Sequence, residues 1–163
     1  MSSQVLSTQE VVGVSGLPDT AWVRFLRAHA ALTRELSSRL EAVHELTLSD
    51  FDVLVQLYYA DGRRMRRIDL ARSVLLTASG ITRLLDGLES SGLVGKERCD
   101  SDARVTYAVL TEAGLRKIEE ARDSHLADIE EVFGGRFSPQ ELEQFAELLG
   151  RLPLAHTSEA CSA

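Results

Sequence analysis

This 163-residue chain has few cysteines, few prolines and no long apolar run, and each scarcity excludes a class of protein. Its two cysteines, Cys99 and Cys161, make a poor disulfide framework, so we expect a reducing, cytoplasmic environment. No apolar stretch approaches the roughly 18 residues that a transmembrane helix needs, and the N-terminus shows no secretory signal. With three prolines and 11 glycines, the chain is not of low complexity. We therefore expect one globular domain and no membrane partner.

Acidic residues outnumber basic ones, 25 to 18, and the resulting net charge of -7 by itself argues against a nucleic-acid partner. The basic residues are unevenly spread, however, because residues 62–104 hold nine of them against six acidic residues. A basic block within an acidic protein is typical of a lobe that meets phosphate. Chance clustering on a solvated surface is the alternative, and charge alone does not decide between the two.

Apolar residues at steps of three and four predict long helices at both ends of the chain. After a flexible arm (1–18), one helix is expected at about 19–45, with Asp19 as its N-cap. Two more should fill residues 111–152, beginning at Thr111-Glu-Ala-Gly114 and at the capping box Ser138-Pro-Gln-Glu141. A monomer of this size would not cover all these apolar stripes, so we expect the helices to pack against a partner. Residues 153–163 are expected to form a disordered tail.

The middle of the chain, about residues 62–110, predicts a winged helix-turn-helix. A preceding helix should begin near Ser49, with Asp52 three residues on, and end at Gly62. A short helix over 68–75, a turn, and a second helix from Thr77 to Ser91 follow. Two strand-like runs, 93–99 and 105–110, are joined by a polar link and form the wing. The fold class is therefore mainly α with a small β-hairpin wing.

At this point the chain resembles the MarR family of bacterial transcriptional regulators, over about residues 19–152. The matching segments are the second-helix run Ser79–Glu89, Gly92-Leu-Val94, Asp102-Ala-Arg104 at the wing tip, and Val109-Leu-Thr-Glu-Ala-Gly114. The chain departs from the family at Ala103, where the first of two adjacent arginines is usual, and at Glu97, an acid between two wing cations. The resemblance implies a ligand-responsive transcriptional regulator and, as is usual in this family, a repressor. Its homodimer would bind a pseudo-palindromic, double-stranded DNA operator, with the recognition helix in the major groove and the wing on the flanking minor groove or backbone.

The resemblance, together with residue chemistry, assigns the DNA contacts. Arg83 is expected to contact base edges, since arginine bonds bidentately to guanine; the alternative is an ion pair with Asp86 or Glu89. The other expected contacts are hydroxyl residues near the helix N-terminus and the charged residues of the wing: Thr77, Ser79, Thr82, Lys96, Arg98, Asp102 and Arg104. For the wing tip, a surface ion pair in an ordinary hairpin is the alternative. The four cations Arg63, Arg64, Arg66 and Arg67 are expected either to touch phosphate or to lie in a solvated loop.

By the same resemblance, a small aromatic or phenolic effector would bind beside the first helix. The candidates for lining its site are Trp22, Arg27, His29 and Asp52, although His29 also suits a core or dimer-interface role. No metal-ligand spacing, cofactor motif or catalytic constellation is found, so we expect no metal, no cofactor and no enzyme. Two alternatives stay open. One is a winged-helix adaptor for protein contacts, and the other is a redox-sensing regulator that uses Cys99.

Overall fold

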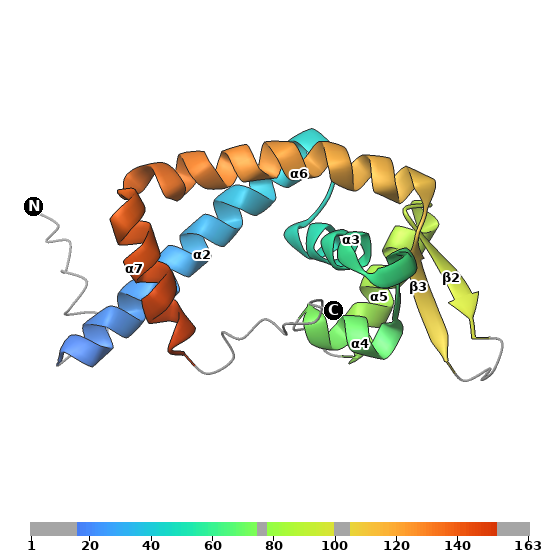
Figure 1. Ribbon diagram of the computed structural model, residues 1–163, viewed down its shortest axis with the longest axis horizontal. Coiled ribbons are helices and arrows are strands. Elements are labelled where there is room, and N and C mark those ends of the chain that lie inside the picture. The colour runs from blue at the N-terminus through green and yellow to red at the C-terminus, as the bar shows by residue number, and fades with distance from the viewer. Residues whose placement is uncertain (1–15, 75–77, 100–104, 153–163) are drawn as a thin grey trace, which may run out of the picture. The chain divides into compact units, whose positions relative to one another are not determined.

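The computed structural model describes residues 16–74, 78–99 and 105–152, and it is dominated by helices (Figure 1). The helices are α2 (Leu17–His44), α3 (Leu48–Tyr59), α4 (Arg67–Ser73), α5 (Ala78–Ser90), α6 (Glu112–Val132) and α7 (Pro139–Gly150). The strands are β1 (Arg64–Arg66), β2 (Val94–Arg98) and β3 (Thr106–Leu110), and single 3-10 turns span Asp61–Arg63 and Gly134–Arg136. The mainly α fold with a small β wing is thus confirmed. Most of the predicted arm and all of the predicted tail lie outside the described residues, and α2 begins at Leu17, just inside the arm.

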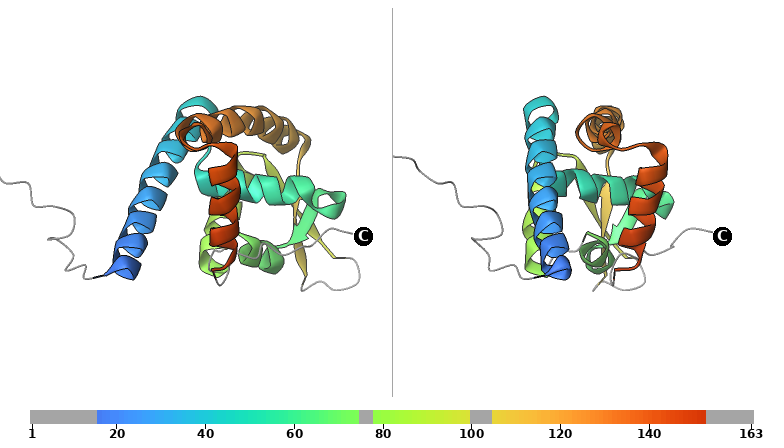
Figure 2. Two further views of the ribbon diagram at one scale, coloured as in Figure 1. Left: turned by 60° about the vertical axis from the view of Figure 1, so that its left-hand side comes forward. Right: turned by 90° about the vertical axis from the view of Figure 1, so that its left-hand side faces the viewer.

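The chain divides into two compact parts, residues 1–35 and residues 36–163, so α2 contributes to both. In the first part, only residues 16–35 are described, and they form the N-terminal portion of α2 with most of its side chains exposed. In the second part, α3, α4, α5 and the strands lie below the N-terminal half of α6 in Figure 1, and they stay close together when the molecule is turned (Figure 2). This second part contains the core.

The core consists mainly of aliphatic side chains from α3, α4, α5, α6 and the wing, together with Leu40 of α2. Its fully buried members include Leu54, Leu57, Leu70, Leu85 and Ile118. Each helix contributes one face, because residues three and four positions apart lie on the same side of a helix. Burying a leucine contributes roughly 1.5–3 kcal/mol, so this cluster accounts for much of the stability of the winged helix.

The wing is a three-stranded antiparallel sheet with strand order β1-β3-β2. The predicted hairpin is confirmed as β2 and β3, with Val94 opposite Leu110 and Arg98 opposite Thr106. The third strand corrects the expectation of a solvated loop at Arg63–Arg67, because Arg64–Arg66 pairs with the free edge of β3. Met65 is half-buried between two exposed arginines, and this alternation is typical of a strand with one covered face.

Helix α3 begins two residues earlier than predicted. Thr47 is the N-cap: its hydroxyl accepts a hydrogen bond from the Asp50 backbone N–H, and the Asp50 carboxylate accepts one from the Thr47 backbone N–H. The sequence offers two overlapping capping patterns, and the Thr47 frame turns Phe51, Leu54 and Leu57 into the core. The helix then stops at Ala60, so the expectation that Gly62 ends it was wrong.

The predicted caps of α6 and α7 are confirmed. The Thr111 hydroxyl accepts from the Gly114 N–H and lies 2.7 Å from the Gly92 carbonyl oxygen, which ties the start of α6 to the start of the wing. Ser138 and Glu141 form the expected capping box, with a proline at the first turn of α7. A local motif thus defines where each of these helices begins.

Candidate nucleic-acid interface

The outer face of α5 follows from which of its side chains are buried. Ile81, Leu85 and Leu88 lie in the core, so the opposite side of the helix carries the exposed Thr82 and Arg83. A helix with one buried stripe presents the other side to solvent, and here that side carries hydroxyl and guanidinium groups. Both groups hydrogen-bond to phosphates and to base edges.

Arg83 is exposed, and within the described residues no carboxylate lies within ion-pair distance of it. The alternative of a pair with Asp86 or Glu89 was wrong, because Asp86 pairs with Arg67 at 3.4 Å and Glu89 with Lys96 at 2.9 Å. Arg83 also lines an open cleft of about 330 Å³ at the N-terminus of α3, together with Ser49, Asp50, Gly80, Leu84 and Gly87.

The wing residues differ in their pairing. The Lys96 ammonium on β2 donates to Glu89, whereas Arg98, at the end of the same strand, is exposed and has no ion pair within the described part of the chain. Thr77, Asp102 and Arg104 lie outside the described residues, as does the side chain of Ser79. Of the eight predicted DNA contacts, the structure places Thr82 and Arg83 on α5 and Lys96 and Arg98 on β2.

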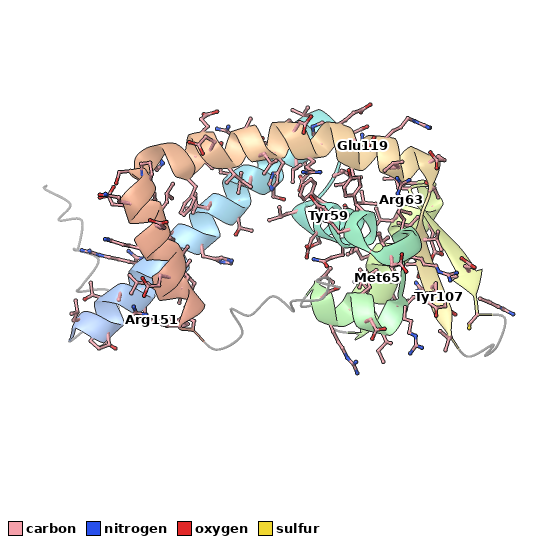
Figure 3. The ribbon with its side chains drawn as sticks, in the orientation of Figure 1. Tyr59, Arg63, Met65, Tyr107, Glu119 and Arg151 are labelled. Atoms are coloured by element: carbon pink, nitrogen blue, oxygen red, sulfur yellow. The ribbon has the colours of Figure 1, made fainter. Side chains whose placement is uncertain are left out.

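Strand β1 adds two ordered cations that sequence reasoning had left in a loop. The Arg64 guanidinium lies 5.0 Å from the ring centroid of Tyr107 and 3.0 Å from the Glu97 carboxylate (Tyr107 is labelled in Figure 3). A hydrogen bond to Tyr107 and the nearby charge of Asp69 raise the pKa of the exposed Arg66. The alternating Arg64-Met-Arg66 pattern was the available signal for this strand.

The candidate effector residues lie on two helices. Trp22, Phe25 and His29 form a ladder of stacked rings along α2, with centroids 6.2 and 6.4 Å apart, and Trp22 is 60% exposed. Arg27 and His29 are exposed, so His29 is not a core histidine of the single chain. Asp52, on α3, is half-buried, and burial raises the pKa of its carboxyl despite a hydrogen bond from Gln56.

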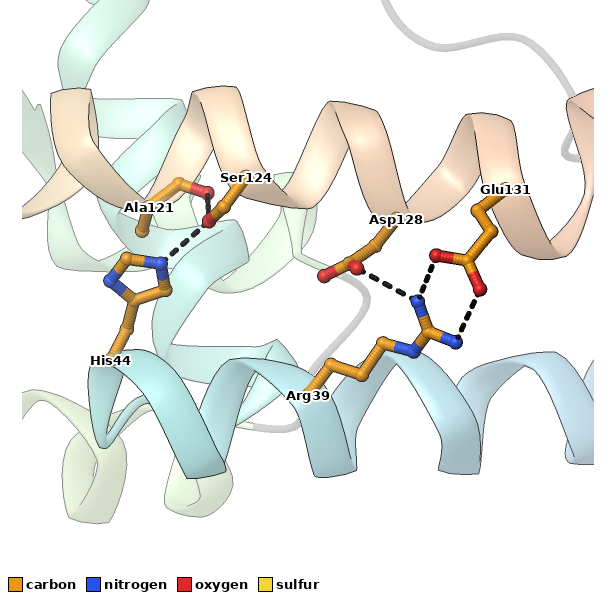
Figure 4. Close-up of polar contacts among 6 residues, drawn as sticks. All are labelled: Arg39, His44, Ala121, Ser124, Asp128 and Glu131. Atoms are coloured by element: carbon orange, nitrogen blue, oxygen red, sulfur yellow. Dashed lines mark hydrogen bonds and ion pairs between the residues drawn. The ribbon is translucent and has the colours of Figure 1, made fainter.

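The C-terminal turns of α2 are attached to α6 by polar contacts that the sequence did not predict (Figure 4). Arg39 binds the Glu131 carboxylate through two nitrogens, at 2.9 and 3.1 Å, and contacts Asp128 at 2.9 Å. Ser124 donates to the Ala121 carbonyl oxygen, and its hydroxyl oxygen lies within hydrogen-bond distance of His44 Nε2, at 2.6 Å. Residues 36–44 are therefore part of the core-bearing portion of the chain.

His125, the other ambiguous histidine, is buried on α6 against the ring of Phe51, with centroids 4.5 Å apart. Burial lowers the pKa of His125, and the charge of Asp128 opposes this only in part. Within the described ranges, no three His, Cys, Asp or Glu side chains gather as a metal site requires. No described helix combines the length and apolar character that crossing a membrane demands.

Comparisons with known proteins agree with this architecture. The model of the MarR family matches residues 46–106, which run from the start of α3 into the wing. The HTH-type transcriptional regulator MhqR of Bacillus subtilis is 29% identical over 128 residues, which cover 78% of this chain and 86% of MhqR.

Two solved structures from Streptomyces coelicolor share the fold. AbsC, a MarR family transcriptional regulator, superposes with a TM-score of 0.76 and 32% identity over 83% of this chain and 93% of AbsC. Sco3205, a MarR family regulator solved in complex with DNA, superposes with a TM-score of 0.77 and 24% identity over 83% of this chain and 88% of its own. The matched fold and the AbsC identity lead to one conclusion: the chain belongs to the MarR family of transcriptional regulators.

Proposed function

We propose that this protein is a ligand-responsive repressor that binds a pseudo-palindromic DNA operator as a homodimer. In this proposal α5 enters the major groove, and the wing contacts the flanking minor groove or backbone. The observation that carries it is Arg83, exposed on the outer face of α5 with no ion pair to any described carboxylate. Sco3205, which has the same fold, was solved with DNA.

The charges on α5 favour DNA over a protein partner. An adaptor would present apolar or acidic residues on this face, but both acids of the second half of α5 are neutralised by neighbouring elements. Asp86 pairs with Arg67, and Glu89 with Lys96. Arg83, by contrast, is exposed with no described carboxylate within ion-pair distance, and its guanidinium suits phosphates and base edges.

Exposed apolar side chains support the homodimer. Leu17 and Trp22 on α2 are 83% and 60% exposed, and Leu148 on α7 is 55% exposed. An isolated chain with such residues on its terminal helices gains stability by burying them against a second copy. Two copies would also present two recognition helices, as a two-fold symmetric operator requires.

The stacked ladder of Trp22, Phe25 and His29 favours an aromatic effector. Aromatic rings stack on flat ligands, and the Arg27 guanidinium on the same helix is suited to pair with an acidic group. A panel of phenolic and heterocyclic acids should therefore raise the melting temperature, because binding to the folded state stabilises it. A flat response for both the wild type and His29→Ala would contradict this assignment.

The DNA-binding proposal is tested by separating sequence-specific contacts with bases from sequence-independent contacts with the phosphate backbone. The wild-type protein is used to enrich a sequence from random duplexes, and binding is then compared on the enriched and random DNA over a range of salt. Arg83→Ala should lose ~1–3 kcal/mol per half-site on the enriched DNA and much less on random DNA. Arg104→Ala should weaken both and flatten the salt dependence, because its expected contact is with the groove or backbone.

Arg151→Ala is the control, since it removes one exposed cation just after α7, where Arg151 pairs with Glu147. It should leave both affinities unchanged. The proposal is overturned if the wild type enriches no sequence, or if Arg83→Ala weakens both DNAs to the same degree.

A further inference from the structure

Glu89 connects three elements of the winged helix. It lies in the last turn of α5, and its Oε2 is 2.9 Å from the Lys96 ammonium on β2. Its Oε1 is 3.8 Å from Arg67 at the start of α4, and the same guanidinium nitrogen lies 3.4 Å from Asp86. One carboxylate thus joins the first helix of the motif, the recognition helix and the wing.

The position of Glu89 is unfavourable without these partners. An acid in the last turn of a helix faces the negative end of the helix dipole. The side chain is also only 20% exposed, and Oε1 is buried without a hydrogen bond to any described residue. Burying part of a carboxylate is costly unless cations compensate for it, so Lys96 and Arg67 are held close to Glu89.

This pairing changes which cations are available to DNA. Arg67 is only 22% exposed, and Lys96, although 47% exposed, holds its ammonium 2.9 Å from the Glu89 carboxylate. Arg83 and Arg98, by contrast, have no ion pair within the described residues. Of these four cations, Lys96 and Arg67 pair with the acids of α5, whereas no described carboxylate lies within ion-pair distance of Arg83 or Arg98.

We propose that Glu89 is a specificity-determining positioning residue that holds α4 and β2 against α5 and withholds Lys96 and Arg67 from phosphate. This inference rests on the proposed DNA-binding function. Phosphate contacts raise the affinity for every sequence alike, whereas base contacts distinguish between sequences. By keeping two cations off the backbone, Glu89 leaves a larger share of the binding free energy to Arg83.

The test compares Glu89→Gln with Glu147→Gln, which makes the same charge change at an exposed ion pair on α7. Glu89→Gln should raise the affinity for random duplex and lower the ratio of enriched-sequence to random binding by roughly tenfold. Its salt slope on random DNA should steepen by about 0.9 for each cation that gains a phosphate. Glu147→Gln should leave the ratio and the slope unchanged.

A second variant, the double substitution Glu89→Gln with Lys96→Gln, tests whether the Lys96 ammonium is the cation that gains a phosphate. It should lose the extra affinity of Glu89→Gln for random duplex, and its salt slope on random DNA should be shallower than that of Glu89→Gln by about 0.9. If the double variant keeps the affinity and the slope of Glu89→Gln, Lys96 is not the withheld cation and the proposal is overturned.

The outcomes distinguish a failure of the proposed DNA-binding function from a failure of the proposed role of Glu89. If the wild type enriches no sequence, the DNA-binding function itself fails. If the wild type discriminates but Glu89→Gln keeps the wild-type ratio, only the role of Glu89 is refuted. A residue that merely maintained the fold would, when replaced, weaken binding to both DNAs and lower the urea midpoint, and that result also refutes the proposal.

Discussion

The contact between α6 and the wing makes Gly114 a position at which one added methyl group should destabilise the winged helix. A Cβ atom placed on Gly114 would lie 2.0 Å from the Leu93 carbonyl oxygen and 2.8 Å from Leu110 Cδ1. The first atom belongs to the backbone and does not move aside by a rotamer change. Gly114→Ala therefore has to push the start of α6 away from the start of the wing.

The magnitude follows from what that displacement breaks. The Leu93 carbonyl accepts hydrogen bonds from the Thr111 backbone N–H at 3.2 Å and from its hydroxyl at 3.0 Å. Each bond contributes about 1 kcal/mol, and overpacking typically costs about 1–3 kcal/mol more. The better helix propensity of alanine returns about 1 kcal/mol. We expect Gly114→Ala to lower the free energy of unfolding by about 2–4 kcal/mol.

Urea unfolding followed by far-ultraviolet circular dichroism, at matched protein concentrations, measures this change. The control is Gly87→Ala in α5, where a Cβ would meet nothing within 4 Å. It should be neutral or stabilise by up to about 1 kcal/mol. If the two variants have equal midpoints, the packing of α6 against the wing is not as described and the reasoning is refuted.

Three further substitutions test other parts of the molecule. Glu45 follows α2 with a φ of 55, in the left-handed region, so Glu45→Gly should raise the free energy of unfolding by about 1 kcal/mol, and a decrease would contradict this conformation. Because burial lowers the pKa of His125, the unfolded chain binds more protons than the folded one below its ordinary pKa of about 6.5, and stability should fall as the pH drops through that value. His125→Leu should make this fall shallower in urea titrations at several pH values, and identical pH profiles would exclude His125 as the cause. Replacing Leu148 and Leu149 with glutamate should yield a 17.9 kDa particle by light scattering, while a wild type that already has this mass would refute the dimer.

The recognition helix was predicted well because its signals are local. The buried residues Ile81, Leu85 and Leu88 recur at helical spacing, and this spacing alone places Arg83 on the opposite face. The same holds for the caps at Thr111 and Ser138, where each motif spans only four residues. The cap of α3 shows the limit of such signals, since two overlapping patterns competed and packing of Phe51 into the core favoured the Thr47 frame.

Other features depend on partners that are distant in the sequence. Strand β1 pairs with the edge of β3 that β2 leaves free, and its alternating pattern covers only three residues, too few to predict a strand without that partner. The contacts of Arg39 with Glu131 and of His44 with Ser124 join residues 92 and 80 positions apart. The sequence does not distinguish these four side chains from ordinary polar surface residues, because their contacts form only when α2 packs against α6.

The ion pairs of the basic residues in 62–104 likewise depend on contacts between residues that are distant in the sequence. Composition alone identified a basic block over residues 62–104, but it did not separate the cations that face a partner from those bound to acids. That separation depends on where α4, α5 and β2 meet, because an ion pair forms only when the fold brings both charges within about 4 Å of each other. The amino-acid sequence by itself therefore determined the helices, the wing and the exposed face of Arg83. Only the tertiary structure decided that Glu89 binds Lys96 while Arg83 has no described acidic partner.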